Sequence, residues 1–149
     1  LILLKFNSSG RSHEDDGYIN RYIHARLAPK HPNIIIDEVG YNTENMLSVI
    51  GSMNYTICTR FHSNIFSTIM GIPFLSIYSS RKVKLFISEI DHGEYAYEIP
   101  TNGDVCVNDL ICRFKHLERD ADKVSDRLDA VYKQYNYYLD TKQPEILLK

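Results

Sequence analysis

The chain has 149 residues, of which 44% are hydrophobic and 24% charged, and its formal net charge is -2. This composition is ordinary for a globular protein, and the length is sufficient for a domain with a buried core. The slightly acidic balance argues against a broad basic surface, so we expect no nucleic-acid partner. No apolar run approaches the ~20 residues of a membrane span, so we expect no such span.

The cysteines and the first residue narrow the class of protein further. Cys58, Cys106 and Cys112 are odd in number and include no Cys-x-x-Cys pair, which argues against a disulfide framework and against a zinc site. The chain begins at Leu1, inside an apolar run that is too short for a signal peptide and indicates a strand. We therefore expect a fragment of a longer protein.

Strands and helices are predicted to alternate through the first two thirds of the chain. Short apolar runs predict strands, and apolar residues three and four positions apart predict helices. The predicted strands cover residues 1–6, 33–37, 55–59, 73–78 and, as a short last strand, 95–99. The predicted helices cover 15–27, 43–53 and 63–70, with another after the Ser79-Ser80 cap, and 7–10 is a turn. This alternation favours βαβ units and a Rossmann-like parallel sheet between helices.

The last third has a different pattern, with apolar residues at intervals of three and four. They are Phe114, Leu117, Ala121, Val124, Leu128, Val131, Tyr135 and Tyr138. This stripe predicts one long amphipathic helix. A coiled coil is one interpretation; we prefer a helix that packs on this domain or on a neighbouring one, because helices gain most stability from such packing. The expected division is an α/β domain over 1–112 and a C-terminal helix and tail over 113–149.

The most informative segment is the turn after the predicted strand 55–59. Arg60 follows that strand directly, where a guanidinium is costly unless it meets a carboxylate or phosphate. Its planar fork suits an anion, although a structural salt bridge explains its position equally well. His62 lies near the start of the next helix, whose positive end disfavours imidazolium without an anion. A neutral His62 could bind an anion or transfer a proton; a capping histidine is the alternative.

A second polar turn follows the strand 73–78. It contains Tyr78, Ser79, Ser80, Arg81 and Lys82. If the strands 55–59 and 73–78 are neighbours, both turns open at the same edge of the sheet and their polar groups converge. The alternative is that the two cations form a solvated first helical turn.

Other polar residues complete the inventory of candidates. Ser63 is best explained as a helix cap, and no Gly-x-Ser-x-Gly pattern surrounds it that would suggest a hydrolase nucleophile. Lys5 and Arg11 flank the turn after the first strand and could supply a third cation at the same edge.

Three ordered motifs resemble the polysaccharide pyruvyl transferase family. They are Arg60-Phe61-His62 at a helix start, Gly71-Ile72-Pro73 before a strand, and Tyr78 and Lys82 after that strand. The resemblance covers residues 43–91. It implies the C-terminal half of a fold like that of the two-domain GT-B glycosyltransferases, with an N-terminal domain missing. It also implies transfer of pyruvate from phosphoenolpyruvate to a sugar of a glycan, which forms a cyclic ketal.

The resemblance implies roles for individual residues. Arg60, His62 and the backbone of Phe61 would contact phosphoenolpyruvate, with Arg60 and His62 as the catalytic pair and His62 as the acid. With the polar groups above, the expected donor-binding set is Arg60, Phe61, His62, Ser63, Tyr78, Ser79, Lys82 and Lys5. No cofactor or metal is implied, because phosphoenolpyruvate is the donor substrate. Phe61 stands where the family usually has leucine, and Lys5 lies near the position of a usual arginine.

Two other functions remain open. One is a GT-B half that uses a nucleotide sugar, although no Glu or Asp follows a Gly-rich turn to bind a ribose. The other is a non-catalytic interaction domain whose long helix docks a partner. We expect a cytoplasmic protein, with the Golgi lumen as the alternative for a eukaryotic chain.

Overall fold

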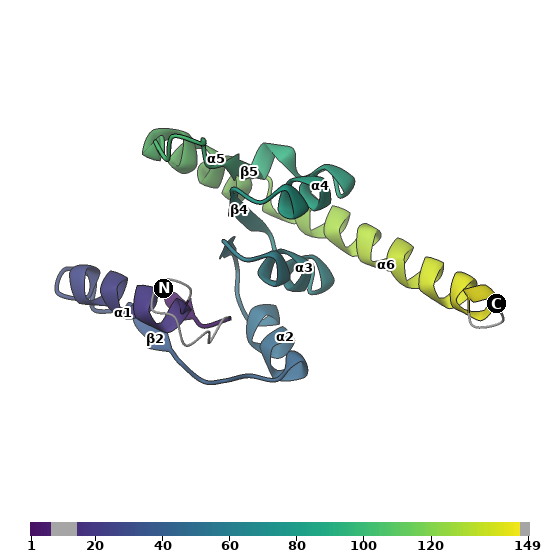
Figure 1. Cartoon of the computed structure of the whole chain (residues 1–149), viewed down its shortest axis with the longest axis horizontal. Coiled ribbons are helices and arrows are strands. Elements are labelled where there is room, and N and C mark those ends of the chain that lie inside the picture. Colours follow the sequence, from purple (N-terminus) through teal and green to yellow (C-terminus); the bar gives the residue numbers. More distant parts are fainter. Residues whose placement is uncertain (7–14, 147–149) are drawn as a thin grey trace. The chain divides into compact units, whose positions relative to one another are not determined.

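The computed structural model describes residues 1–6 and 15–146, with side chains up to Tyr138 (Figure 1). The predicted turn at 7–10 and the candidate cation Arg11 lie outside the described residues. The chain forms two compact units, Leu1–Glu44 and Asn45–Lys149, and each is described by itself below. In the described part of the chain, no helix is both long enough and apolar enough to cross a membrane.

The first unit is one βαβ unit. Its strands β1 (Ile2–Leu4) and β2 (Ile35–Asp37) pair in parallel, and α1 (Asp16–Leu27) connects them. The helix begins where the Asp15 carboxylate accepts a hydrogen bond from the Gly17 N–H at 2.8 Å. Helix α2 (Thr43–Gly51) begins at the end of this unit and continues into the second. The predicted strands and helices of this region are confirmed.

The second unit contains a sheet of three parallel strands. They are β3 (Thr56–Cys58), β4 (Phe74–Tyr78) and β5 (Ala96–Glu98), with β4 in the middle. The crossovers are α3 (Phe61–Ile69) and α4 (Arg81–Glu89), and a single 3-10 turn, Gly93–Tyr95, leads into β5. The predicted strand order along the chain is confirmed, including the short last strand.

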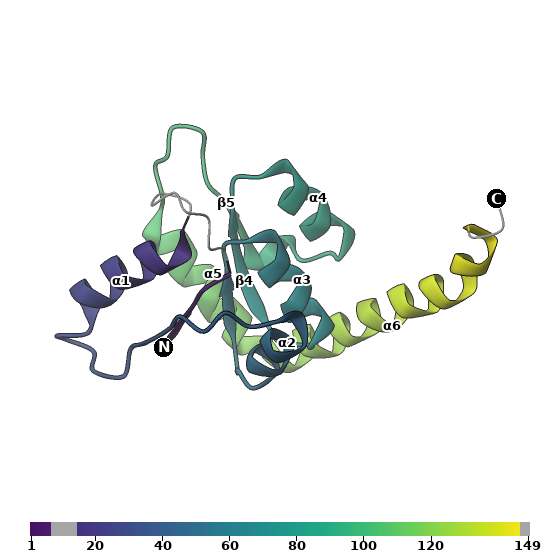
Figure 2. The ribbon, with the colours of Figure 1, turned by 60° about the horizontal axis from the view of Figure 1, so that its bottom comes forward.

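Helices cover both faces of this sheet (Figure 2). Cys58 faces α3, since its sulfur lies 3.5 Å from Ser67 Oγ. On the opposite face, the Tyr55 ring meets Phe114 of α5 (Val107–Arg119) edge-on, with the ring centroids 5.8 Å apart. The Rossmann-like α/β class is therefore confirmed: parallel strands lie between helices.

The predicted long C-terminal helix is confirmed, but the apolar stripe lies on two helices and not on one. Helix α5 ends at Arg119, and the long helix α6 (Ala121–Ile146) begins after Asp120. The Asp120 carboxylate accepts a hydrogen bond from the Tyr95 hydroxyl at 3.0 Å and pairs with His116 and Arg119 at the end of α5. These contacts tie the break between the helices to the rest of the unit.

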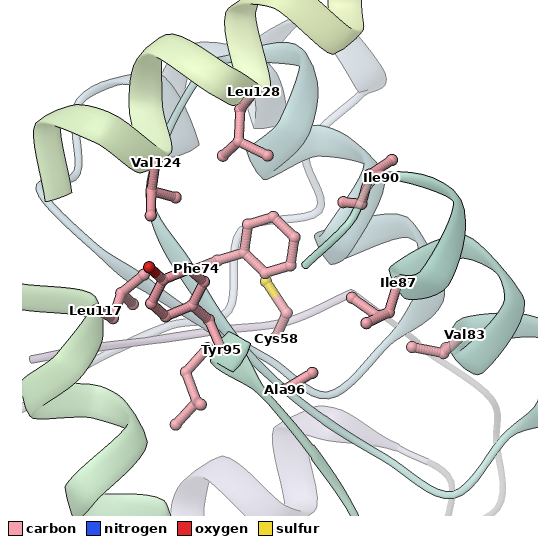
Figure 3. Close-up of a cluster of buried hydrophobic side chains, with 11 residues drawn as sticks. Cys58, Phe74, Val83, Ile87, Ile90, Tyr95, Ala96, Leu117, Val124 and Leu128 are labelled. Carbon is pink, nitrogen blue, oxygen red and sulfur yellow. The ribbon is translucent and has the colours of Figure 1, made fainter. Parts of the chain in front are cut away.

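The apolar stripe nevertheless continues across the break. Leu117 of α5 and Val124 and Leu128 of α6 are at most 1% exposed, and they share one core with Phe74 and Tyr95 (Figure 3). Burial of each such side chain stabilises the fold by roughly 1.5–3 kcal/mol. From Phe114 to Val131, apolar residues of the stripe therefore lie in or against the core of this unit, whereas Tyr135 and Tyr138 are exposed.

Gly71 allows α6 to pack closely at the end of α3. Its φ of +64° lies in the left-handed region, and a Cβ atom there would be 2.4 Å from Asp129 Oδ1. The Ser125 hydroxyl of α6 donates a hydrogen bond to the Gly71 carbonyl at 2.6 Å. Backbone conformation and helix packing thus both explain the glycine of the Gly71-Ile72-Pro73 motif.

Candidate functional site

The two polar turns predicted from the sequence lie at the same edge of the sheet. Strands β3 and β4 pair in parallel, with Cys58 opposite Ser76, so the turns that follow them leave from the same side. The turns are in contact. Lys82 Nζ of α4 lies 3.8 Å from the centroid of the Phe61 ring at the start of α3, and Phe86 meets that ring edge-on at 5.8 Å.

Arg60 immediately precedes α3 and has an extended backbone, with φ -111° and ψ 149°. Its backbone is held by Ser63, whose hydroxyl donates to the Arg60 carbonyl at 2.7 Å and accepts from the Arg60 N–H at 3.3 Å. A residue at this position usually caps the helix with a side-chain oxygen, but a guanidinium has no acceptor atom. The Arg60 side chain therefore does not cap the first-turn N–H groups of α3.

His62 and Ser63, which are adjacent in α3, differ in their exposure. The His62 side chain is exposed, and its ring centroid lies 5.8 Å from that of Phe61. Ser63 is only 7% exposed, and its hydroxyl proton is used in the bond to Arg60. An imidazole in this position can reach a ligand in solvent, whereas the Ser63 hydroxyl fixes the backbone of the turn.

The turn after β4 provides a phenol, two hydroxyls and two cations. Burial, followed by the nearby Glu98 carboxylate, raises the pKa of Tyr78, so its phenol stays protonated at neutral pH and can donate a hydrogen bond. Ser79 and Ser80 are exposed, and the Ser80 side chain does not cap α4. Lys82 is also exposed, so its ammonium can meet a ligand.

The first turns of α3 and α4 differ from those of the other α-helices in the described residues. The other four α-helices have an acidic residue in the first turn: Asp16, Glu44, Asp109 and Asp122. Helices α3 and α4 have none, and carry Arg60, His62, Arg81 and Lys82 in or beside this turn. A cation at the positive end of a helix is unfavourable by roughly 0.3–1 kcal/mol. A bound anion removes this penalty, so the pair of helix ends is suited to an anionic ligand.

Comparison with known proteins identifies the family of the chain. A family model described as polysaccharide pyruvyl transferase matches residues 1–81, more than half of the chain. The chain belongs to the polysaccharide pyruvyl transferase family. The family resemblance that the sequence motifs indicated is therefore confirmed. The matched segment ends at Arg81, one residue before Lys82. No curated protein and no solved structure matches the chain.

Analysis of the sequence did not predict an ion pair that lies at the same edge of the sheet. Glu98 ends β5 opposite Tyr78 of β4, and its carboxylate accepts a hydrogen bond from Lys84 of α4 at 2.7 Å. Both side chains are about half exposed, so the pair contributes little to stability. The position of Glu98 at the end of a strand was the signal in the sequence that could have identified it.

Lys5, which lies near the usual arginine of the family, is in the first unit. Its ammonium lies 3.6 Å from Asp15 Oδ1, and both side chains are partly buried. Burial alone would raise the pKa of Asp15, but the Gly17 N–H and the Lys5 ammonium lower it overall. Within its own unit, Lys5 therefore has a structural partner.

The other groups in the described residues that could carry chemistry are poor candidates. Burial raises the pKa of the Cys58 thiol, which makes it a weak nucleophile. Within 1–6 and 15–146, no three His, Cys, Asp or Glu side chains are grouped to hold a metal ion.

An open depression of about 470 Å³ lies beside Tyr55 and Pro73, where β3 and β4 begin. Open α/β sheets bind ligands at the carboxyl ends of their strands, so we favour the two turns.

Proposed function

We propose that this chain is the donor-binding half of a transferase that moves pyruvate from phosphoenolpyruvate to a sugar of a polysaccharide. The observation that carries the proposal is the pair of adjacent helix ends, at α3 and α4, that have cations in place of acids. Family membership supports pyruvyl transfer to a polysaccharide. An N-terminal domain would bind the acceptor, as the GT-B-like architecture of the resemblance implies.

Phosphoenolpyruvate has two anionic groups, a carboxylate and a phosphate, and therefore needs at least two cationic contacts. The Arg60 guanidinium suits a two-pronged bond to one of them. The Lys82 ammonium, the Tyr78 phenol and the Ser79 hydroxyl are suited to the other. The contact between Phe61 and Lys82 brings the two turns close enough to share one small ligand.

The reaction also needs a proton donor, and we assign this role to His62. Protonation of the methylene carbon of phosphoenolpyruvate leaves a cationic centre at the adjacent carbon. A sugar hydroxyl attacks this carbon and loses its proton, and phosphate then leaves with the electron pair of its bond to that carbon. A second hydroxyl of the sugar attacks the same carbon and loses its proton, which closes the cyclic ketal. His62 is suited to the first step because its imidazole is exposed beside the Arg60 turn.

A nucleotide-sugar glycosyltransferase half is the second candidate. Glu98 is the observation that favours it, because a carboxylate at the end of a strand can bind the hydroxyls of a ribose. In this structure the carboxylate is paired with Lys84, which makes it less available to a ligand.

Calorimetric titration of the chain with phosphoenolpyruvate and with UDP tests the proposal. We expect phosphoenolpyruvate to bind and UDP not to bind. Arg60→Ala should weaken donor binding by about 10- to 100-fold, the cost of losing one charged hydrogen-bonded pair. His62→Ala should leave donor affinity within about threefold and lower the rate of a complete enzyme by about 100-fold or more.

Arg119→Ala is the matched control, because Arg119 is an exposed arginine at the end of α5 and should not affect donor binding. Unchanged donor affinity in Arg60→Ala would show that the assignment is wrong. Binding of UDP alone would favour the glycosyltransferase, and binding of neither ligand would favour an interaction domain.

A further inference from the structure

Helix α3 has a buried asparagine one turn after Arg60. Asn64 is only 1% exposed, and its amide nitrogen donates a hydrogen bond to the Arg60 carbonyl at 2.7 Å. A carbonyl oxygen can only accept, so the amide must present its nitrogen to Arg60. The Oδ1 atom of Asn64 is then buried without a hydrogen-bond partner among the described residues. A buried unsatisfied oxygen costs stability, so folding alone does not explain asparagine at this position.

Three donors converge on the Arg60 carbonyl. The Ser63 hydroxyl and the Asn64 side-chain amide each lie 2.7 Å from it, while the backbone N–H of Asn64 is more distant, at 3.4 Å. An ordinary helix start satisfies this carbonyl with the backbone N–H alone. The two side chains therefore add bonds that the helix does not require, and both bonds act on the backbone of Arg60.

We propose that Asn64, together with Ser63, positions Arg60 for donor binding. The two side chains fix the backbone from which the guanidinium extends. They also surround the partial negative charge of the carbonyl with donors, beside a site for an anion. The inference rests on the proposed function and adds a buried residue that contacts no ligand yet sets donor affinity.

Two substitutions of Asn64 separate positioning from folding. Asn64→Leu has a similar volume and removes both the donor and the unsatisfied oxygen. It should keep or raise the melting temperature and weaken phosphoenolpyruvate binding by roughly tenfold, as small displacements of a binding group do. Asn64→Ser keeps a donor, because a serine hydroxyl can bond the carbonyl four residues earlier. Thr68 makes this bond to the Asn64 carbonyl at 2.9 Å in the same helix.

Asn64→Ser should therefore bind phosphoenolpyruvate within about threefold of the unmodified chain, although its smaller side chain leaves a cavity that lowers the melting temperature. Asn64→Leu is thus expected to be the more stable variant and the weaker binder, and Asn64→Ser the less stable variant and the tighter binder. If Asn64 were purely structural, the more stable variant would also bind phosphoenolpyruvate more tightly, or neither variant would change the affinity.

Ser67→Ala is the matched control. Ser67 is fully buried in the same helix, and its hydroxyl bonds Thr56 Oγ1 at 2.7 Å and Cys58 Sγ at 3.5 Å. This variant should lower the melting temperature and leave donor affinity unchanged.

Calorimetric titration with phosphoenolpyruvate and thermal melting of the full chain decide the matter. Unchanged affinity in Asn64→Leu, or equal losses in Asn64→Leu and Asn64→Ser, would overturn the positioning role. If Asn64→Leu does not fold, the same comparison is made between Asn64→Ala and Asn64→Ser, which leave similar cavities. If the unmodified chain does not bind phosphoenolpyruvate, the proposed function itself fails and this inference fails with it.

Discussion

Two regions of the second unit use the same types of side chain in opposite ways. One is the edge with the two polar turns, which presents arginine, histidine and tyrosine. The other is the junction between α5 and α6, defined here by His92, Tyr95, Asp120 and Arg127. At the junction His92 is fully buried, and its two ring nitrogens lie 2.8 Å from the Phe74 carbonyl and 3.1 Å from Arg127 Nη2. Both ring nitrogens of His92 therefore have partners within the protein.

The environments change how these groups ionise. Burial, and then the Arg127 charge, lower the pKa of His92 to about 4, although the Phe74 carbonyl opposes this. Burial and the bond to Asp120 raise the pKa of Tyr95 to about 12. Both groups are therefore neutral at physiological pH. At the edge, His62 and Lys82 are exposed and form no salt bridge with any residue in 1–6 or 15–138.

The comparison shows that burial and partners within the protein, rather than residue type, distinguish the structural histidine His92 from the candidate catalytic histidine His62. Substitutions at the junction should change stability without changing the affinity for phosphoenolpyruvate, the proposed donor. Substitutions at the edge should change this affinity without changing stability. Three experiments could break this separation.

The largest effect is expected from Leu128→Ala, in the core beside the junction. Leu128 is fully buried, so its truncation should lower the free energy of unfolding by about 2–5 kcal/mol. Urea unfolding followed by circular dichroism measures this loss. Leu85→Ala is the control, because Leu85 is 60% exposed and its loss should cost less than about 0.5 kcal/mol. A drop in phosphoenolpyruvate affinity of the folded protein would break the separation of the two regions.

The second experiment concerns pH. The folded state keeps His92 neutral down to a pH of about 4, whereas an unfolded histidine binds a proton below about 6.5. The unfolded state thus binds more protons between these values, so stability is full above about pH 7 and falls as the pH falls. The expected loss from His92 is about 2 kcal/mol between pH 7.5 and pH 5.

His92→Gln should remove this part of the pH dependence, as urea unfolding at the two pH values would show. His62→Gln is the control and should keep the dependence of the unmodified chain, because His62 is exposed. An equal loss of pH dependence in both variants would contradict the assignment to the buried ring.

The smallest effect is expected from Phe61→Leu, at the edge. The ring of Phe61 holds the Lys82 ammonium at 3.8 Å, a contact worth about 0.5–1 kcal/mol at an exposed site. Its loss should weaken phosphoenolpyruvate binding by about two- to fivefold, as measured by titration, with little change in stability. Phe61→Tyr keeps an aromatic face and should bind as the unmodified chain does. Tighter binding in Phe61→Leu would mean that the ring holds Lys82 away from the donor.

Much of the fold could be predicted because its signals are local. The apolar runs and the three- and four-residue spacings predicted the strands and helices, and they placed Arg60 and His62 directly after a strand. The break at Asp120 was missed because the apolar spacing continues from Leu117 to Val124 without interruption. Only the bonds from Tyr95 and His116 to the Asp120 carboxylate show why the chain changes direction there.

By itself, the sequence determined which elements form, their order, and which residues follow each strand, since these depend on contacts between near neighbours in the chain. The tertiary structure alone decided which polar groups acquire partners. Parallel pairing of β3 and β4 brings Phe61 against Lys82, and pairing of β4 with β5 brings Glu98 within reach of Lys84. The energy of a charged or polar group depends on its burial and its partners, and both are set by contacts between residues that are distant in the chain.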